Sequence, residues 1–361
     1  MLFEPYSYRT HHLRNRLVMA PMTRNRALGN LPNALMAEYY AQRATAGLII
    51  TEGVAPSANA LGYARIPGLF TPEQVAGWKL TTDAVHAGGG TIFVQFMHTG
   101  RASHVDNLPA GARVVGAVDT PLSGTIFTDT KGPQTPSTPH ALTEAEIAET
   151  VAEYAHAATL AIEAGFDGIE LHGANGYLIE QFLNPNVNTR TDGYGGSIEG
   201  RNRFALEVAR ACAAAIGAER VGIRISPYGA FNDMGPFPEV EPQFLALVAG
   251  LSAIGLVHLH LVDHSSMGAP AVPAPFKAAL RKAFTGVFIA SGGLDLAKAE
   301  HVLTSGDADL AAFGRQALAN PDLVERLQQH APLNPPDFAT FYTAGEKGYT
   351  DYPTLVLASQ A

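Results

Sequence analysis

VFIASGGLDLAKAEHVLTSGDADLAAFGR, residues 287–315, contains two short apolar runs separated by a segment with helical features. The runs, 287–293 and 310–315, are nearly continuous in apolar residues rather than alternating, as in strands that are covered on both faces. Asp295 precedes a periodic segment that ends near Gly306, and these residue types are typical of helix starts and ends. The stretch therefore predicts one β–α–β unit with parallel strands.

The same pattern recurs along the whole chain. Its eight strand candidates are LVMAPM (17–22), GLIITEG (47–53), TIFVQFMH (91–98), GIELHG (168–173), VGIRISP (221–227), VHLHLV (257–262), VFIASGG (287–293) and LAAFGR (310–315). Helical segments lie between them, one beginning with the capping-box pattern of Thr143 and Glu146. Eight such units predict an α/β fold, a single-domain (β/α)8 TIM barrel over residues 1–361, with its active site at the C-terminal strand ends.

A doubly wound sheet is the alternative fold. It would require a glycine-rich dinucleotide fingerprint after the first strand, and APMTRNRA (20–27) contains none. Residues 99–141, rich in Gly, Pro, Thr and Ser, predict a long excursion after the third strand, which we interpret as a capping loop or subdomain with a small hairpin. Residues 332–361 are expected to form a C-terminal tail folded back on the barrel.

Composition narrows the class of partner. The net charge is −9, and Lys and Arg are scattered singly, so we expect no nucleic acid or anionic membrane partner and favour a small molecule. Cys212 is the only cysteine, which excludes an intrachain disulfide or a Cys-ligated cluster and suits a cytoplasmic location. No signal-peptide run is evident, and no segment approaches the roughly 20 apolar residues of a membrane span.

Glycines and one arginine follow the last two strands, where this fold usually binds phosphate. Gly292 and Gly293 alone are typical of a tight turn. With Gly314 and Arg315 one unit later, they favour a phosphate site built from backbone amides and a guanidinium.

Two polar residues stand inside apolar strands. Arg224 requires an anionic partner, which is either a ligand or an internal salt bridge. Gln95 can donate and accept at once, which suits the edge of a fused-ring ligand or, alternatively, a core amide that satisfies backbone groups.

Long motifs resemble those of a known family. They are MAPMTRNRA (19–27), EYYAQRATAGLIITEG (38–53), LHGANGYLIEQFLNPNVNTRTDGYGGSIEGRNRF (171–204), GIRISP (222–227), AFGRQALANPDL (312–323) and GYTDYPTL (348–355). In these motifs the chain resembles the Old Yellow Enzyme family of flavin-dependent ene-reductases, in its threonine-containing branch. The resemblance implies a (β/α)8 barrel that binds FMN noncovalently.

The resemblance also implies roles for matching positions. Thr23 would bind the flavin carbonyl next to the redox-active nitrogen, and Gln95 would bind the pyrimidine edge. Arg224 would stabilise the negative charge of the reduced ring. The remaining implied contacts are backbone packing by Pro21 and Met22, close approach at Gly53, and phosphate binding by Gly292, Gly293, Gly314 and Arg315.

The implied reaction is a ping-pong reduction of activated C=C bonds in enones, enals, maleimides or nitro compounds by NADPH or NADH. His172 and Asn175 would donate hydrogen bonds to the substrate carbonyl oxygen, where negative charge develops. Tyr177 would protonate the α-carbon. Pocket walls implied by the resemblance are Tyr63, Met97 and Tyr342.

Two positions differ from other members of the family. Met97 stands where the best-known members have tryptophan, and the only tryptophan, Trp78, falls in a predicted outer helix. Because a thioether is smaller and more flexible than an indole, we expect a roomier pocket. Some members have a second histidine at the position of Asn175, and both residue types donate hydrogen bonds.

Other functions stay open from the sequence. An FMN quinone reductase or flavin sensor would use the same donors. A metal-dependent hydrolase is a remote alternative, because His258 and His260 share one face of a strand, with Asp263 and His264 following. The first strand lacks further ligands, so we expect no metal. The physiological alkene, the preferred nicotinamide and the choice between monomer and homodimer are not indicated.

Overall fold

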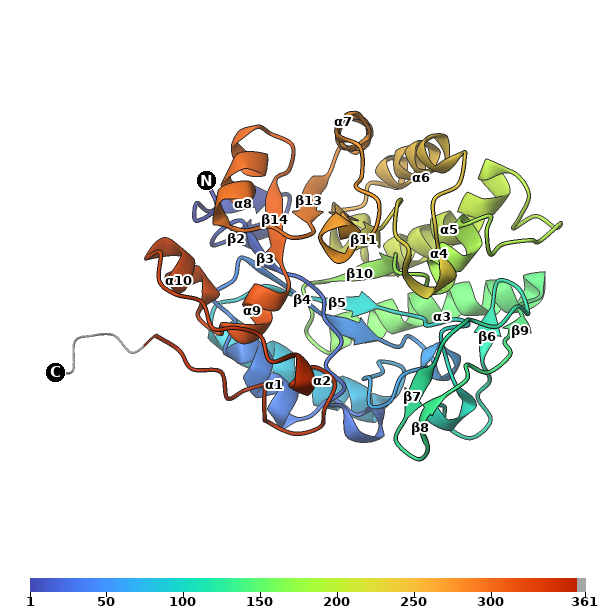
Figure 1. Ribbon diagram of the computed structural model, residues 1–361, viewed down its shortest axis with the longest axis horizontal. Helices are drawn as coiled ribbons and strands as arrows, with labels where there is room; N and C mark the ends of the chain where they lie inside the picture. Colours follow the sequence, from blue (N-terminus) through green and yellow to red (C-terminus); the bar gives the residue numbers. More distant parts are fainter. Residues whose placement is uncertain (356–361) are drawn as a thin grey trace.

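The computed structural model describes residues 1–355 and contains a closed barrel of parallel strands (Figure 1). In chain order the barrel strands are β3 (Leu17–Met19), β4 (Leu48–Val54), β5 (Ile92–Phe96), β10 (Gly168–Gly173), β11 (Val221–Ile225), β12 (His258–Val262), β13 (Val287–Ser291) and β14 (Leu310–Phe313). Each pairs with the next, and β14 pairs with β3. Every predicted run overlaps one of these strands, so the predicted fold class is confirmed.

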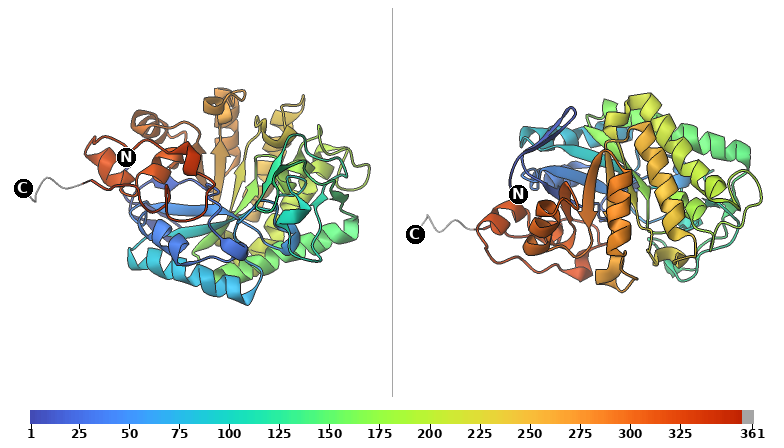
Figure 2. Two further views of the ribbon diagram at one scale, coloured as in Figure 1. Left: turned by 60° about the horizontal axis from the view of Figure 1, so that its bottom comes forward. Right: turned by 90° about the horizontal axis from the view of Figure 1, so that it is seen from above.

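Helices surround the strands on the outside of the barrel (Figure 2). They are α1 (Ala34–Ala41), α2 (Pro72–Ala87), α3 (Glu144–Glu163), α4 (Leu178–Leu183), α5 (Ile198–Ile216), α6 (Val240–Ile254), α7 (Ala274–Ala283), α8 (Leu296–Thr304), α9 (Arg315–Ala319) and α10 (Leu323–Gln328). The predicted starts are confirmed, since Thr143 and Glu146 form a capping box and Asp295 accepts from Lys298 N. Trp78 lies in α2, as predicted, and is fully buried. None of the helices in residues 1–355 is long and apolar enough to cross a membrane.

Short 3-10 helices fill several loops. They are η1 (Leu28–Asn30), η2 (Ala58–Ala60), η3 (Val105–Asn107), η4 (Ala218–Arg220), η5 (Phe231–Asp233), η6 (His264–Met267) and η7 (Phe338–Thr340). Of these, η5 and η6 follow barrel strands β11 and β12, so they lie at the end of the barrel where the site is expected.

The barrel interior contains a layer of polar side chains. Every residue of β10, β11 and β12 is buried, yet these strands carry Glu170, His172, Arg224, His258 and His260. The register places Gln95 beside Glu170, and Arg224 between His172 and His260. Because alternate residues of a strand share one face, Glu170 and His172 point to the same side, as do His258 and His260.

An antiparallel hairpin that the sequence did not indicate closes the opposite end of the barrel. It consists of β1 (Tyr6–Tyr8) and β2 (His11–Leu13). Tyr6, Tyr8 and Leu13 pack against residues near the starts of the strands, including Phe93 and Val257. This apolar plug leaves the C-terminal end of the barrel as the open end.

The excursion after β5 contains four short strands: β6 (Val115–Gly116), β7 (Ile126–Thr128), β8 (Gly132–Gln134) and β9 (His140–Ala141). β7 and β8 form the predicted hairpin, and β6 pairs with β9 in parallel. Leu122 and Ile126 form a buried cluster with Ala102, and the partly buried rings of Tyr63 and Tyr177 pack against this cluster. The excursion therefore packs over residues expected in the site, and its function as a cap stays a proposal.

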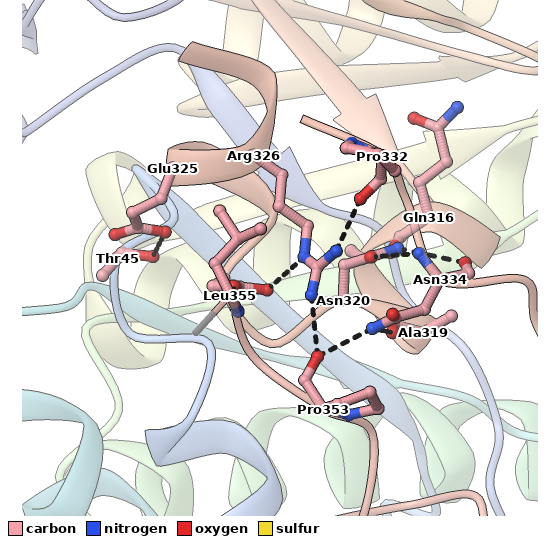
Figure 3. A network of polar contacts seen from close by, with 12 residues as sticks. Thr45, Gln316, Ala319, Asn320, Glu325, Arg326, Pro332, Asn334, Pro353 and Leu355 are labelled. Atoms are coloured by element: carbon pink, nitrogen blue, oxygen red, sulfur yellow. Dashed lines mark hydrogen bonds and ion pairs between the residues drawn. The ribbon is translucent and has the colours of Figure 1, made fainter. Parts of the chain in front are cut away.

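The described part of the C-terminal tail, residues 332–355, lies against α9 and α10 (Figure 3). The guanidinium of Arg326 donates to the carbonyls of Pro332 and Pro353 at 2.5 and 2.8 Å. Leu355 N donates to Asp322 at 2.6 Å. The end of the predicted tail, residues 356–361, lies outside the described residues.

Candidate active site

A cavity of about 1470 Å³ opens at the C-terminal ends of the barrel strands. Ligand pockets commonly measure about 300–1,000 Å³, so there is room for a flavin and a second ligand. The structure brings together all but one of the predicted site residues, and the cavity is lined by Pro21, Met22, Thr23, Tyr63, Gln95, Met97, His172, Asn175, Tyr177, Arg224, Gly292, Gly293, Gly314, Arg315 and Tyr342.

His172 is a neutral hydrogen-bond donor. It lies near the C-terminal end of strand β10, and its side chain is almost completely buried. Its Nδ1 accepts a hydrogen bond from Ala174 N at 3.3 Å. Burial lowers the pKa of His172 well below 6.5, and the nearby charge of Arg224 lowers it further. A neutral ring that accepts at Nδ1 carries its proton on Nε2. His172 can therefore donate through Nε2 without carrying charge.

Asn175 occupies an unusual backbone conformation beside His172. Its φ is 60° and that of Gly176 is 75°, so two successive residues lie in the left-handed region. Asparagine tolerates this conformation better than most residues, and glycine does so without a steric penalty. The side chain lines the cavity, while its Oδ1 is buried and has no partner among residues 1–355. Asn175 can therefore present its amide nitrogen to a ligand.

Tyr177 directly precedes α4 and faces the same cavity. Its ring lies edge-on to His172, with centroids 4.8 Å apart, and edge-on to Tyr63 at 6.1 Å. Burial raises the pKa of Tyr177 well above 10, and the neighbouring Tyr63 raises it further. The phenol therefore keeps its proton, which it can donate to a strongly basic carbon.

A buried carboxylate, that of Glu170, orients the side chain of Gln95 in the cavity lining. Glu170 Oε1 accepts from Gln95 Nε2 at 2.8 Å, which leaves the Gln95 carbonyl oxygen for a ligand. Burial alone would raise the pKa of Glu170, but the adjacent His260 and His258 lower it well below its usual range. Gln95 is thus held by a side chain rather than by the backbone groups of the alternative interpretation.

Arg224 is buried close to this carboxylate without pairing to it. It forms no ion pair within residues 1–355, and its Nε has no hydrogen-bond partner there. The internal salt bridge that the sequence left open is therefore not formed. An unpaired guanidinium lining a cavity favours an anionic or electron-rich ligand.

The two histidines of the metal-site alternative are engaged with the same carboxylate oxygen. His258 Nε2 and His260 Nδ1 both lie 2.9 Å from Glu170 Oε2. Asp263 instead bonds Ser265 N and Lys277. Residues 1–355 contain no group of three or more side chains arranged to hold a metal ion. The geometry gives no support to a metal-dependent hydrolase.

Glycines and a free guanidinium form one corner of the cavity. Gly292 has φ of 119°, and a Cβ there would lie 2.0 Å from the carbonyl oxygen of Asp263, so only glycine fits. Lys298 Nζ donates to the Gly293 carbonyl at 3.3 Å. Arg315 is exposed and, within residues 1–355, is not part of any ion pair. This corner suits a phosphate, and with Gln95 and Arg224 it fits the two ends of FMN.

Gly53 is the exception among the predicted residues, because it does not line the cavity. A Cβ at Gly53 would meet Met97 Sδ at 2.5 Å. The glycine therefore makes room for Met97, which is 1% exposed and packs beside Tyr63 and Tyr177. The close approach that Gly53 permits in the structure is to Met97, and its predicted contact with the flavin stays a proposal.

Several lining residues were not expected from the sequence. His264, in η6, is buried with Nδ1 unpartnered among residues 1–355. The rim carries exposed apolar side chains, namely Phe127, Phe231, Met267, Phe338 and Tyr342, of which only Tyr342 was predicted. Their only sequence signal was the occurrence of large apolar residues in loops, which the periodicity of helices and strands does not detect.

The loop that carries Thr23 is anchored to the C-terminal tail. Arg24 donates to the carbonyls of Phe341 and Gly348 at 3.1 and 2.7 Å. Its backbone N–H donates to the buried carboxyl of Glu52 at 3.3 Å, and Tyr40 donates to the same carboxyl at 3.3 Å. These contacts fix the Thr23 side of the cavity.

We expect stability to fall as the pH rises through neutrality because of Glu52. Burial raises the pKa of Glu52 from 4.5 to about 7, so its contribution is complete below pH 4.5 and is lost above pH 7. The loss should be about 3 kcal/mol. Denaturant unfolding of the parent and Glu52→Gln at about pH 5 and pH 8.5 checks this. Equal pH dependence in both proteins would contradict it.

Comparison with known proteins agrees with the fold and identifies the family. A model of the NADH:flavin oxidoreductase / NADH oxidase family matches residues 1–334. The chain is 42% identical over 375 residues to 12-oxophytodienoate reductase 7 of Oryza sativa subsp. japonica, covering 98% of this chain and 94% of that protein. It is 44% identical over 347 residues to a probable flavin mononucleotide-dependent alkene reductase of Leishmania infantum, covering 94% of each.

A solved structure is equally similar. Morphinone reductase in complex with tetrahydroNAD superimposes with a TM-score of 0.93 at 42% identity, covering 98% of this chain and 97% of that one. The chain therefore belongs to the NADH:flavin oxidoreductase / NADH oxidase family, which confirms the predicted resemblance to the Old Yellow Enzyme family of flavin-dependent oxidoreductases.

Proposed function

We propose that the protein binds FMN noncovalently and reduces activated C=C bonds of α,β-unsaturated carbonyl compounds with NADPH or NADH. The observation that carries this proposal is the convergence of His172, Asn175 and Tyr177 on one cavity with the polar groups that suit a flavin. Relatives named as an alkene reductase and as 12-oxophytodienoate reductases support it.

The residues that would hold FMN all line the cavity. Gln95 and Arg224 would bind the polar edge of the ring, with Thr23 at its redox-active side. Gly292, Gly293, Gly314 and Arg315 would bind the phosphate, while Pro21 and Met22 pack against the ring. When bound, FMN supplies the hydride that is added to the β-carbon of the alkene.

The protein's own groups would act on the carbonyl oxygen and the α-carbon. The carbonyl oxygen gains negative charge as the β-carbon receives hydride. Two fixed donors, His172 Nε2 and the Asn175 amide, stabilise this charge more than they stabilise the neutral carbonyl. Tyr177 then gives its proton to the α-carbon, so that the product is a saturated carbonyl compound. Solvent restores the phenolic proton.

Flavin content and turnover test this function together. The purified protein should absorb as a flavoprotein and release FMN on denaturation. Its consumption of NADPH or NADH under anaerobic conditions should depend on 2-cyclohexenone, maleimide or a nitroalkene and should yield the saturated product. A flavin-loaded protein that turns over quinones but none of these alkenes would instead be an FMN quinone reductase.

We expect Met97→Trp to narrow the substrate range. Met97 lines the cavity next to Tyr63 and Tyr177, and an indole would fill space that a flexible thioether leaves open. Relative kcat/KM for enones with bulky 2- or 3-substituents should fall about 10-fold against unsubstituted 2-cyclohexenone. Product enantiomers should be compared by chiral chromatography. Unchanged selectivity and enantiomeric ratio would show that Met97 does not limit the pocket.

The rim favours apolar alkenes. Phe127, Phe231 and Phe338 are 51%, 42% and 62% exposed around the cavity mouth.

A cytoplasmic location and a monomeric or homodimeric state are also proposed. The first is supported by Cys212, a single buried thiol, and gel filtration with light scattering decides the second.

A further inference from the structure

The turn that presents Asn175 is held by side chains from three separate segments. Asn175 N donates to Ser226 Oγ at 3.1 Å, and Asn175 O accepts from Asn232 Nδ2 at 2.7 Å. Gly176 N donates to Glu180 Oε2 at 2.6 Å, and Gly176 O accepts from Gln181 Nε2 at 2.8 Å. All four backbone polar groups of the two left-handed residues are therefore bonded to side chains.

Glu180 is the centre of this arrangement. It is 3% exposed, and its other oxygen, Oε1, accepts from Ser226 Oγ at 3.0 Å. One carboxyl thus holds Gly176 directly and Asn175 through Ser226. Glu180 lies in α4, one turn after Tyr177, so the same helix start fixes the turn and the proposed proton donor.

The backbone conformation of the Asn175–Gly176 turn depends on the residues that surround it. Two consecutive residues with positive φ persist only where the surroundings fix them, because at least the non-glycine residue is strained. A Cβ at Gly176 would meet Asn232 Cβ at 2.6 Å and Phe231 O at 2.8 Å, so the η5 loop lies directly against the turn. A small rotation at Asn175 would turn its amide away from the cavity and from His172.

We propose that Glu180, acting through Gly176 and Ser226, is a positioning residue that aims the Asn175 amide at the oxygen of a bound carbonyl or phenolate ligand. This inference rests on the proposed function, since it assigns Asn175 to that oxygen. It adds a group outside the cavity lining whose removal impairs oxygen recognition while the cavity walls stay intact. Burial raises the pKa of Glu180 to about 8, while the hydrogen bonds from Gly176 and Ser226 lower it. The amide of Glu180→Gln has the shape of the carboxyl and keeps one acceptor oxygen.

The test uses the FMN-loaded protein and three variants. Glu180→Leu removes both acceptors, Ser226→Ala removes the acceptor for Asn175 N, and Glu180→Gln keeps an acceptor for Gly176 N and donates to Ser226 Oγ. Val248→Ala, a buried change in α6 away from the cavity, is the matched control for lost stability. Binding of 4-hydroxybenzaldehyde is titrated through the flavin absorbance, and turnover is measured with 2-cyclohexenone. Reoxidation of the dithionite-reduced flavin is measured with ferricyanide, which has no carbonyl oxygen to bind.

Glu180→Leu and Ser226→Ala should each weaken phenol binding and lower kcat with 2-cyclohexenone about 10-fold or more. Glu180→Gln should stay within about 3-fold of the parent in both, and in all variants the rate at which ferricyanide reoxidises the reduced flavin should stay within about 2-fold. Parent-like phenol binding in Ser226→Ala overturns the proposal, even if Glu180→Leu does not fold. A parent that binds the phenol but reduces no alkene would refute the proposed function, while the phenol affinities would still decide the role of Glu180.

Discussion

Replacing His172 with alanine is expected to lower kcat for 2-cyclohexenone by about 100- to 1,000-fold, the usual effect of removing one donor to a developing oxyanion. The expectation rests on the state of the ring. His172 accepts from Ala174 N through Nδ1 and is kept neutral by burial and by Arg224, so Nε2 always carries a proton. The site is also largely closed to water on this side, which strengthens the interaction.

Stopped-flow mixing of the reduced holoenzyme with 2-cyclohexenone measures this step by itself. FMN content should be unchanged, because the predicted flavin contacts come from other strands. The pH profile should also separate His172 from an acid. Since His172 is already neutral, the alkene step of the parent should show no loss of rate as the pH rises from about 6 to about 8. A loss over that range, or a parent-like rate in His172→Ala, would show that another group binds the oxygen.

Replacing Tyr177 with phenylalanine is expected to slow formation of the saturated product by about 100-fold or more. The phenol is held protonated by burial and stands edge-on to His172, at the position from which it can reach a ligand whose oxygen His172 binds. Phenylalanine preserves the ring contacts with His172 and Tyr63, so the change removes the proton with little effect on packing.

Product formation under steady-state conditions measures the effect, with Tyr154→Phe as the matched control. Tyr154 is a buried tyrosine of α3 that lies outside the cavity lining. Its variant should keep parent-like turnover. If Tyr177→Phe also turns over at the parent rate, the proton comes from water or another side chain, and the assignment of Tyr177 is wrong.

The barrel could be predicted because strands that are buried on both faces appear in the sequence as nearly continuous apolar runs. Strands such as β10 and β12 are wholly buried, so their apolar runs stand out, and a polar residue within them signals the interior of the barrel. Gln95 and Arg224 were recognisable for this reason. The β1–β2 hairpin was not, because its strands have three residues each and are only partly buried.

Contacts between distant segments could not be read from the sequence. Glu170 appeared to be one more strand residue, yet it holds Gln95, His258 and His260, which come from two other strands. The packing of Met97 against Gly53 was likewise not indicated by the sequence. The side chains that hold the Asn175 turn likewise depend on how β10, β11 and α4 meet. The local periodicity of the sequence gives no indication of such contacts between distant segments.

The positions of hydrogen isotopes in the product show whether hydride is added to the β-carbon of the C=C bond and a proton from Tyr177 to its α-carbon, as we propose. 2-Cyclohexenone should be reduced by the FMN-loaded protein with unlabelled NADPH or NADH in D2O, and the product analysed by NMR. We expect cyclohexanone with one deuterium at C2, delivered from the Tyr177 phenol after its exchange with D2O, and with hydrogen at C3. An allylic alcohol, or a product with deuterium at C3 in place of C2, would contradict it.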